Sequence, residues 1–124
     1  PVSYAAFKAN MQTIINKALS VGATVILTIP NPIAQYDDGN GWSQATMRQA
    51  YYELAATNGC QLIDAPVLYA QAGFAATSPA PYSEMNANNL FYDAFHPRAP
   101  VFAVEGAALG DAIKTALIVR GAYG

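Results

Sequence analysis

The residues best suited to catalysis are Asp93 and His96, three positions apart in the segment YDAFHP at 92–97. His96 is the only histidine of the chain. On a tight turn, a carboxylate at this spacing can accept a hydrogen bond from Nδ1 of the imidazole and leave Nε2 facing outward, as a general base requires. The same spacing also occurs where an aspartate caps an ordinary turn beside a surface histidine. Spacing alone therefore leaves both interpretations open.

Aromatic residues in or beside predicted loops are candidates for substrate binding. Tyr36, Trp42 and Tyr92, with Tyr82 as a further member, carry rings that can stack on sugars when exposed. Exposed aromatic residues also occur singly without a binding role. Tyr36, Trp42 and Tyr92 are predicted to contact substrate on this argument.

Two acidic features suggest a metal or ligand site, and the sequence favours a structural role for both. The segment DDGNG at 37–41 lacks the spacing and the closing glutamate of an EF-hand loop, so a plain turn is predicted. Asp64 ends a predicted strand, where open α/β sheets place ligands, but capping the next helix is its favoured role. We predict neither a metal ion nor a cofactor.

The composition limits what the chain can be. Its 124 residues are the length of one domain, and 53% hydrophobic against 11% charged residues is typical of a folded core. A net charge of −2 without a basic cluster argues against nucleic acid as a partner. Cys60 is the only cysteine, so no internal disulfide can form. No apolar run approaches the roughly 18 residues of a membrane helix.

The elements that must position the pair begin with a helix. Ser3 can cap an amphipathic helix that Gly22 closes, and the run 24–29 follows as a strand covered on both faces, which Pro30 ends. The chain has no initial methionine and enters this helix almost at once, from which we expect that other residues precede it.

A second helix and strand complete a crossover unit. Ser43 caps a helix that ends at Asn58 and Gly59, and residues 61–64 form a second short buried strand. Strand, helix and strand within about forty residues are typical of a right-handed βαβ unit. The sequence therefore predicts an α/β fold with a parallel sheet.

The remainder is less regular. Residues 66–73 are predicted to form a short helix and 74–92 a long loop. Residues 104–120 are predicted to form a final helix with one apolar stripe, made of Leu109, Ile113, Ala116 and Leu117. Two strands are few for a parallel sheet, which normally has helices on both faces. We expect a three-layer α/β/α architecture of which part of the sheet is missing.

This order of elements, together with the final block, resembles the C-terminal half of SGNH hydrolases, also called GDSL-type esterases. The resemblance covers nearly the whole chain and is carried by VILTIP at 25–30, YYELA at 51–55, LID at 62–64, DAFHP at 93–97 and the final helix. In that family the last block is Asp-x-x-His, often followed by proline. The resemblance implies that Asp93 orients His96 and that His96 activates a serine.

The chain also departs from the family. It has no Gly-Asp-Ser block for the nucleophile and no Gly-x-Asn-Asp block for the oxyanion donor, and none of its serines follows Gly-Asp. The resemblance therefore implies that residues 1–124 are the C-terminal part of one SGNH domain, with the nucleophile half upstream or on a second chain. Residues 98–103 are a second departure, a connection longer than the family's usual turn.

The function implied by the resemblance is that of a serine esterase or deacylase on acyl esters, carbohydrate esters among them, with the isolated chain inactive. The alternative is a non-catalytic binding or structural module of a phage tail or cell-surface protein. The few charges and the Ala, Asn and Tyr content favour a secreted or virion protein.

Overall fold

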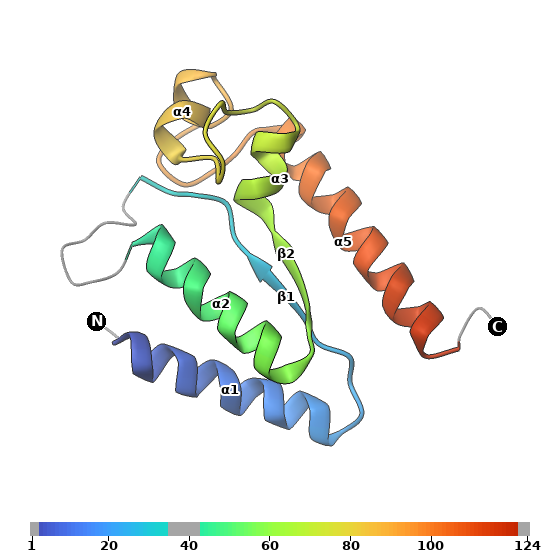
Figure 1. The fold of residues 1–124 in the computed structure, drawn as a ribbon. Helices are drawn as coiled ribbons and strands as arrows, with labels where there is room; N and C mark the ends of the chain where they lie inside the picture. Colours follow the sequence, from blue (N-terminus) through green and yellow to red (C-terminus); the bar gives the residue numbers. More distant parts are fainter. Residues whose placement is uncertain (1–2, 35–42, 122–124) are drawn as a thin grey trace. The chain divides into compact units, whose positions relative to one another are not determined.

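The computed structural model describes residues 3–34 and 43–121. In these ranges the fold is mixed α/β (Figure 1). The elements are α1 (Tyr4–Ser20), β1 (Ile26–Ile29), α2 (Gln44–Asn58), β2 (Gln61–Asp64), α3 (Ala65–Gln71), α4 (Tyr82–Ala87) and α5 (Ala99–Val119). Strands β1 and β2 are parallel neighbours in one sheet, which confirms the predicted pairing. Two strands do not define the layers of a sandwich.

The chain divides into two compact units. The first comprises Pro1–Thr28 and Tyr36–Leu62, and the second comprises Ile29–Gln35 and Ile63–Gly124. The first unit contains α1 and α2, and the second contains α3, α4 and α5 together with the Asp-x-x-His segment.

The two helices of the first unit start and stop as their sequences predict. The hydroxyl oxygens of Ser3 and Ser43 accept hydrogen bonds from the backbone N–H groups of Ala6 and Thr46, at 3.2 and 3.1 Å. Gly59 ends α2 with φ of 63°, a left-handed conformation that glycine adopts without a steric penalty. Strand β1 begins at Ile26, two residues after the predicted start at 24, and is shorter than predicted by those two residues.

Helices α1 and α2 lie side by side and share a small core (Figure 1). Its buried members are Ile15, Leu27, Leu54 and Ala55. The apolar stripe predicted on α1 is only partly covered, since Ile15 is 2% exposed and Ile14 is 63% exposed. Within this unit, α1 therefore buries only part of its apolar surface.

The second unit has the larger cluster of buried residues. Tyr69, Met85 and Val101 are fully buried, and Ala65, Ala75, Ala80 and Phe91 complete the cluster. Met85 belongs to α4, a helix that lies inside the predicted loop 74–92. With six residues, α4 is too short to display a helical period in the sequence. Its Glu84 carboxylate accepts hydrogen bonds from the backbone N–H groups of Ala76 and Thr77, which orders the preceding loop.

Helix α5 begins at Ala99, five positions before the predicted start at 104. Pro100 lies in its first turn, where the missing N–H of proline costs no hydrogen bond. The expected long connection at 98–103 is therefore wrong, because these residues form the cap and first turns of the helix.

The apolar stripe predicted for α5 faces solvent. Leu109, Ile113 and Leu117 are 43%, 46% and 36% exposed, whereas Val101 and Ala112 are buried. Helix α5 packs on α3 through its other side. Within residues 3–34 and 43–121, the structure has no helix long and apolar enough to cross a membrane.

Candidate functional site

The Asp-x-x-His segment forms a short antiparallel hairpin anchored in the core of the second unit. Phe91 and Pro97 face each other as a β-bridge, and both are buried. The backbone N–H of Tyr92 donates to the carbonyl of His96 at 2.9 Å, and that of Arg98 donates to the carbonyl of Leu90 at 2.8 Å. The hairpin is thus closed on both sides of the bridge, and its tip carries Asp93 and His96.

The Asp93 carboxylate is held at three points. Its Oδ1 accepts the backbone N–H groups of Phe95 and His96, both at 2.8 Å, and its Oδ2 lies 2.7 Å from Nδ1 of His96. These contacts lower the pKa of Asp93 to about 2. The backbone N–H of Phe95 has the largest effect and the imidazole of His96 the next largest. The predicted contact between Asp93 and Nδ1 of His96 is present.

The His96 imidazole is oriented but not enclosed. Its side chain is 72% exposed, and Asp93 is its hydrogen-bond partner among the described residues. A neutral imidazole that donates from Nδ1 carries its free lone pair on Nε2. His96 is therefore arranged to accept a proton at Nε2 from a group that approaches from solvent.

The hairpin tip contacts the segment that follows β1. The side-chain amide of Asn31 donates to the carbonyl of Phe95 at 3.2 Å, and the backbone N–H of Ala34 donates to the carbonyl of Ala94 at 3.1 Å. Because Asn31 follows the last residue of β1 by two positions, the tip lies beside the carboxyl end of that strand. Open parallel sheets place ligands at this end.

Serine side chains do not complete a triad within the described part of the chain. Ser3 and Ser43 cap helices, and the Ser20 hydroxyl donates to the carbonyl of Lys17 at 2.8 Å. No serine in residues 3–34 or 43–121 is hydrogen-bonded to His96. In these ranges the structure thus places a carboxylate beside an imidazole that no serine contacts.

Of the predicted substrate-binding aromatics, only Tyr92 lies in the described ranges. Tyr92 is 67% exposed and the guanidinium of Arg98 lies 4.3 Å from its ring centroid. Tyr36 and Trp42 lie outside the described residues, as does the acidic turn at 37–41. Tyr82, the further candidate, packs edge-on against the buried Phe91 and donates to the carbonyl of Asp93 at 3.2 Å, so it braces the hairpin.

Asp64 has the structural role that the sequence favours. It is the N-cap of α3, with Oδ1 3.4 Å from the backbone nitrogen of Val67. In the part of the chain that the structure describes, no group of three His, Cys, Asp or Glu side chains could hold a metal ion.

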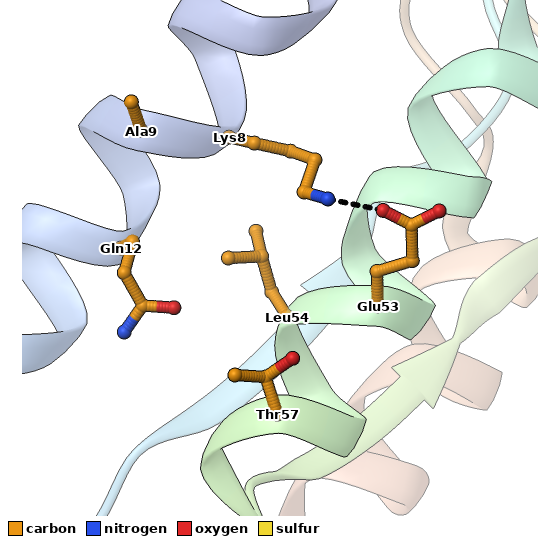
Figure 2. Close-up of a pocket in the computed structure, with 6 residues that line it drawn as sticks. All are labelled: Lys8, Ala9, Gln12, Glu53, Leu54 and Thr57. Atoms are coloured by element: carbon orange, nitrogen blue, oxygen red, sulfur yellow. Dashed lines mark hydrogen bonds and ion pairs between the residues drawn. The ribbon is translucent and has the colours of Figure 1, made fainter.

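A groove between α1 and α2 was not predicted from the sequence. It has a volume of about 270 Å³ and is lined by Lys8, Ala9, Gln12, Glu53, Leu54 and Thr57 (Figure 2). Lys8 reaches across from α1 to the Glu53 carboxylate, and the hydroxyl of Tyr4 also donates to it, at 2.9 Å.

Three polar side chains that line this groove, those of Lys8, Gln12 and Glu53, already have hydrogen-bond partners. The Gln12 and Asn58 amides exchange hydrogen bonds at 2.7 and 2.8 Å. The ammonium of Lys8, the amide of Gln49 and the hydroxyl of Tyr4 hold the pKa of Glu53 at about 2. Since the contacts between α1 and α2 join residues 45 to 49 positions apart, no local sequence signal marks the groove. We interpret the groove as the polar seam of a helix pair.

Comparison with known protein families, curated proteins and solved structures gives no significant match to this chain.

Proposed function

We propose that this chain supplies the Asp93–His96 pair of a serine esterase or deacylase that acts on acyl esters. One observation carries the proposal. The Asp93 carboxylate is held by two backbone N–H groups and lies 2.7 Å from Nδ1 of an imidazole whose other side is open. An ordinary capped turn needs the backbone contacts but not the contact to the imidazole.

In the proposed reaction, a serine from polypeptide outside residues 1–124 attacks the ester carbonyl. Nε2 of His96 takes the serine proton and then transfers it to the oxygen of the leaving alcohol. Asp93 stabilises the imidazolium between these two transfers and keeps the ring in the productive tautomer. A water molecule then releases the acyl group by the same two proton transfers, with His96 first as base and then as acid.

The architecture proposed for the complete domain is a three-layer α/β/α sandwich. In this proposal β1 and β2 belong to a larger parallel sheet, whose other strands come from a second half on the same or another chain. The exposed apolar stripes support it, because Ile14 of α1 and the row Leu109, Ile113 and Leu117 of α5 have no covering surface among the described residues. Added strands and helices would bury such surface.

The test compares residues 1–124 alone with a longer polypeptide that also contains the proposed nucleophile half. The chain alone should be inert, since each missing oxyanion donor alone costs roughly 3 kcal/mol of transition-state stabilisation. In the longer polypeptide, His96→Ala should lower turnover of an aryl acetate about a thousandfold or more. Full activity of residues 1–124 alone, or no effect of His96→Ala, would place the chemistry elsewhere.

A non-catalytic binding module of a phage tail or cell-surface protein is the second candidate. It is favoured by the 72% exposure of His96, because an imidazole so open to water lacks the walls of a closed active site. Binding of an acylated carbohydrate without any turnover by the longer polypeptide would support this candidate over the enzyme.

A further inference from the structure

The register of the hairpin brings three functional side chains to one face. The bridge pairs Phe91 with Pro97, so the adjacent pairs are Tyr92 with His96 and Leu90 with Arg98, as their backbone hydrogen bonds show. Successive residues of extended backbone alternate between the two faces. Phe91 and Pro97 are buried, whereas the Tyr92 and His96 side chains are exposed and the Arg98 guanidinium lies on the Tyr92 ring, so these three side chains lie on the side away from the core.

Arg98 is held in place on this face without a carboxylate partner. Its guanidinium lies 4.3 Å from the ring centroid of Tyr92, and the side chain is half-buried. Its Nε atom is buried and has no hydrogen-bond partner. No carboxylate in residues 3–34 or 43–121 forms an ion pair with it. A positioned guanidinium with unused donors matches the geometry of a carboxylate or a similar anion.

Asp93 is close in sequence but does not neutralise this cation. Both of its carboxylate oxygens are already used, Oδ1 by two backbone N–H groups and Oδ2 by the imidazole of His96. The positive charge of Arg98 is thus available to a ligand that has its reacting group at His96.

We propose that Arg98 is a specificity-determining residue that selects acyl esters carrying a carboxylate. The proposal rests on the proposed esterase function, because it assumes that the ester carbonyl lies at His96. His96 and Arg98 are two positions apart in the chain, a distance of roughly 7 Å between their Cα atoms where the backbone is extended. A four- or five-atom spacer between the carbonyl and the carboxylate spans this distance. The Tyr92 ring occupies one side of the guanidinium, so an anion must approach from another side.

The experiment uses the longer polypeptide and two pairs of esters that differ only in charge. The first pair places the carboxylate on the acyl side: mono-4-nitrophenyl adipate and neutral 4-nitrophenyl hexanoate. The second pair places it on the alcohol side: 4-acetoxybenzoate and its methyl ester. The kcat/KM for each of the four esters is measured with the unmodified protein and with Arg98→Gln. The control variant is Lys114→Gln, which removes a cation from the exposed surface of α5.

Arg98→Gln should lower kcat/KM for one of the two anionic esters by about tenfold to a hundredfold, the usual effect of losing a charge-assisted hydrogen bond. The neutral esters should change less than twofold, which also shows that the variant folds. Lys114→Gln should change neither. The pair of esters whose anionic member loses kcat/KM shows whether Arg98 binds a carboxylate on the acyl side or on the alcohol side of the substrate. An equal loss for charged and neutral esters, or no loss, would overturn the proposal.

A binding titration separates this proposal from the esterase proposal. Adipate is added while the ring signals of His96 are followed by nuclear magnetic resonance, with the signals assigned by their absence in His96→Asn. Adipate should shift these signals, and Arg98→Gln should weaken its binding about tenfold. If adipate binds in this way and no ester is hydrolysed, the result supports the anion site at Arg98 and rejects the proposed esterase function. Turnover that depends on His96, with no adipate binding and no charge preference, supports the esterase and rejects the role of Arg98.

Discussion

Two carboxylates of this molecule have the same low pKa for different reasons. Glu53 reaches a pKa of about 2 through side chains of two helices, with Lys8 the largest cause and Gln49 and Tyr4 contributing. Asp93 reaches a pKa of about 2 through the backbone N–H of Phe95, the imidazole of His96 and the backbone N–H of His96. The first network connects helices, and the second closes within four residues.

The difference distinguishes a structural carboxylate from one suited to catalysis. Lys8 and Tyr4 of α1 hold the Glu53 carboxylate of α2, and Gln49 of α2 occupies its other oxygen, so no group of this network resembles the free ring nitrogen of His96. Asp93 is held by donors of its own turn, and it orients an imidazole whose second nitrogen remains open. A depressed pKa is thus a property of both sites, and only the free nitrogen of His96 makes one of them a candidate for proton transfer.

The largest expected effect comes from neutralising each carboxylate in turn. In the longer polypeptide, Asp93→Asn should lower ester turnover by about a thousandfold or more, because an asparagine neither fixes the imidazole tautomer nor stabilises the imidazolium. Glu53→Gln should leave kcat/KM within about twofold. Steady-state kinetics with an aryl acetate measure both. Equal losses in the two variants would mean that the comparison between the sites is wrong.

A second comparison concerns the cores beneath the two networks. Phe91 is 3% exposed under the hairpin and Leu54 is 3% exposed between α1 and β1. Replacing either by alanine should destabilise the fold by about 3 to 4 kcal/mol through lost burial and the cavity that remains. Denaturant unfolding gives these values.

Only one of these two core substitutions should affect the site. In the folded fraction, Phe91→Ala should also weaken the contact between Asp93 and His96, because Phe91 anchors the hairpin. Leu54→Ala should leave that contact unchanged. The chemical shift of the Nδ1 proton of His96 reports on it, and an unchanged shift in Phe91→Ala would contradict the anchoring role.

A smaller effect is expected for the amide pair in the seam of the first unit. Asn58 exchanges hydrogen bonds with Gln12 and also donates to the carbonyl of Leu54. Asn58→Ala should cost about 1 kcal/mol, the usual net contribution of such contacts. Ser20→Ala, which removes an exposed hydroxyl contact within α1, is a matched control with a smaller expected change. Thermal unfolding measures both, and equal shifts would argue against the seam as a structural feature.

The smallest effect is the change of stability with pH, because both carboxylates are exposed and water screens their interactions. Each has a folded pKa of about 2, below the unfolded values of about 4. Their stabilisation is therefore fully present above about pH 4 and is lost as the pH falls towards 2. The unfolding midpoints of Glu53→Gln and the unmodified protein should converge over this window. A difference that grows with falling pH would reverse the assigned sign.

Features that depend on a few neighbouring residues could be predicted from the sequence. Ser3, Ser43 and Asp64 cap the helices they precede, and Gly59 ends α2, because each of these interactions closes within three or four residues. The contact between Asp93 and His96 belongs to the same class. A spacing of three residues nearly fixes its geometry once the turn forms.

Features that depend on residues far apart in the chain were decided by the tertiary structure. The seam around Glu53 joins positions 45 to 49 apart, and α4 forms around Met85, which the core of the second unit buries completely. Periodicity predicted an apolar stripe on α5 but could not show that Leu109, Ile113 and Leu117 would remain exposed. Likewise, the side-chain types suggested a site at His96, but the alignment of Arg98 with it follows from the pairing of Phe91 with Pro97. Local interactions are encoded by adjacent residues, whereas burial and pairing depend on which distant surfaces meet.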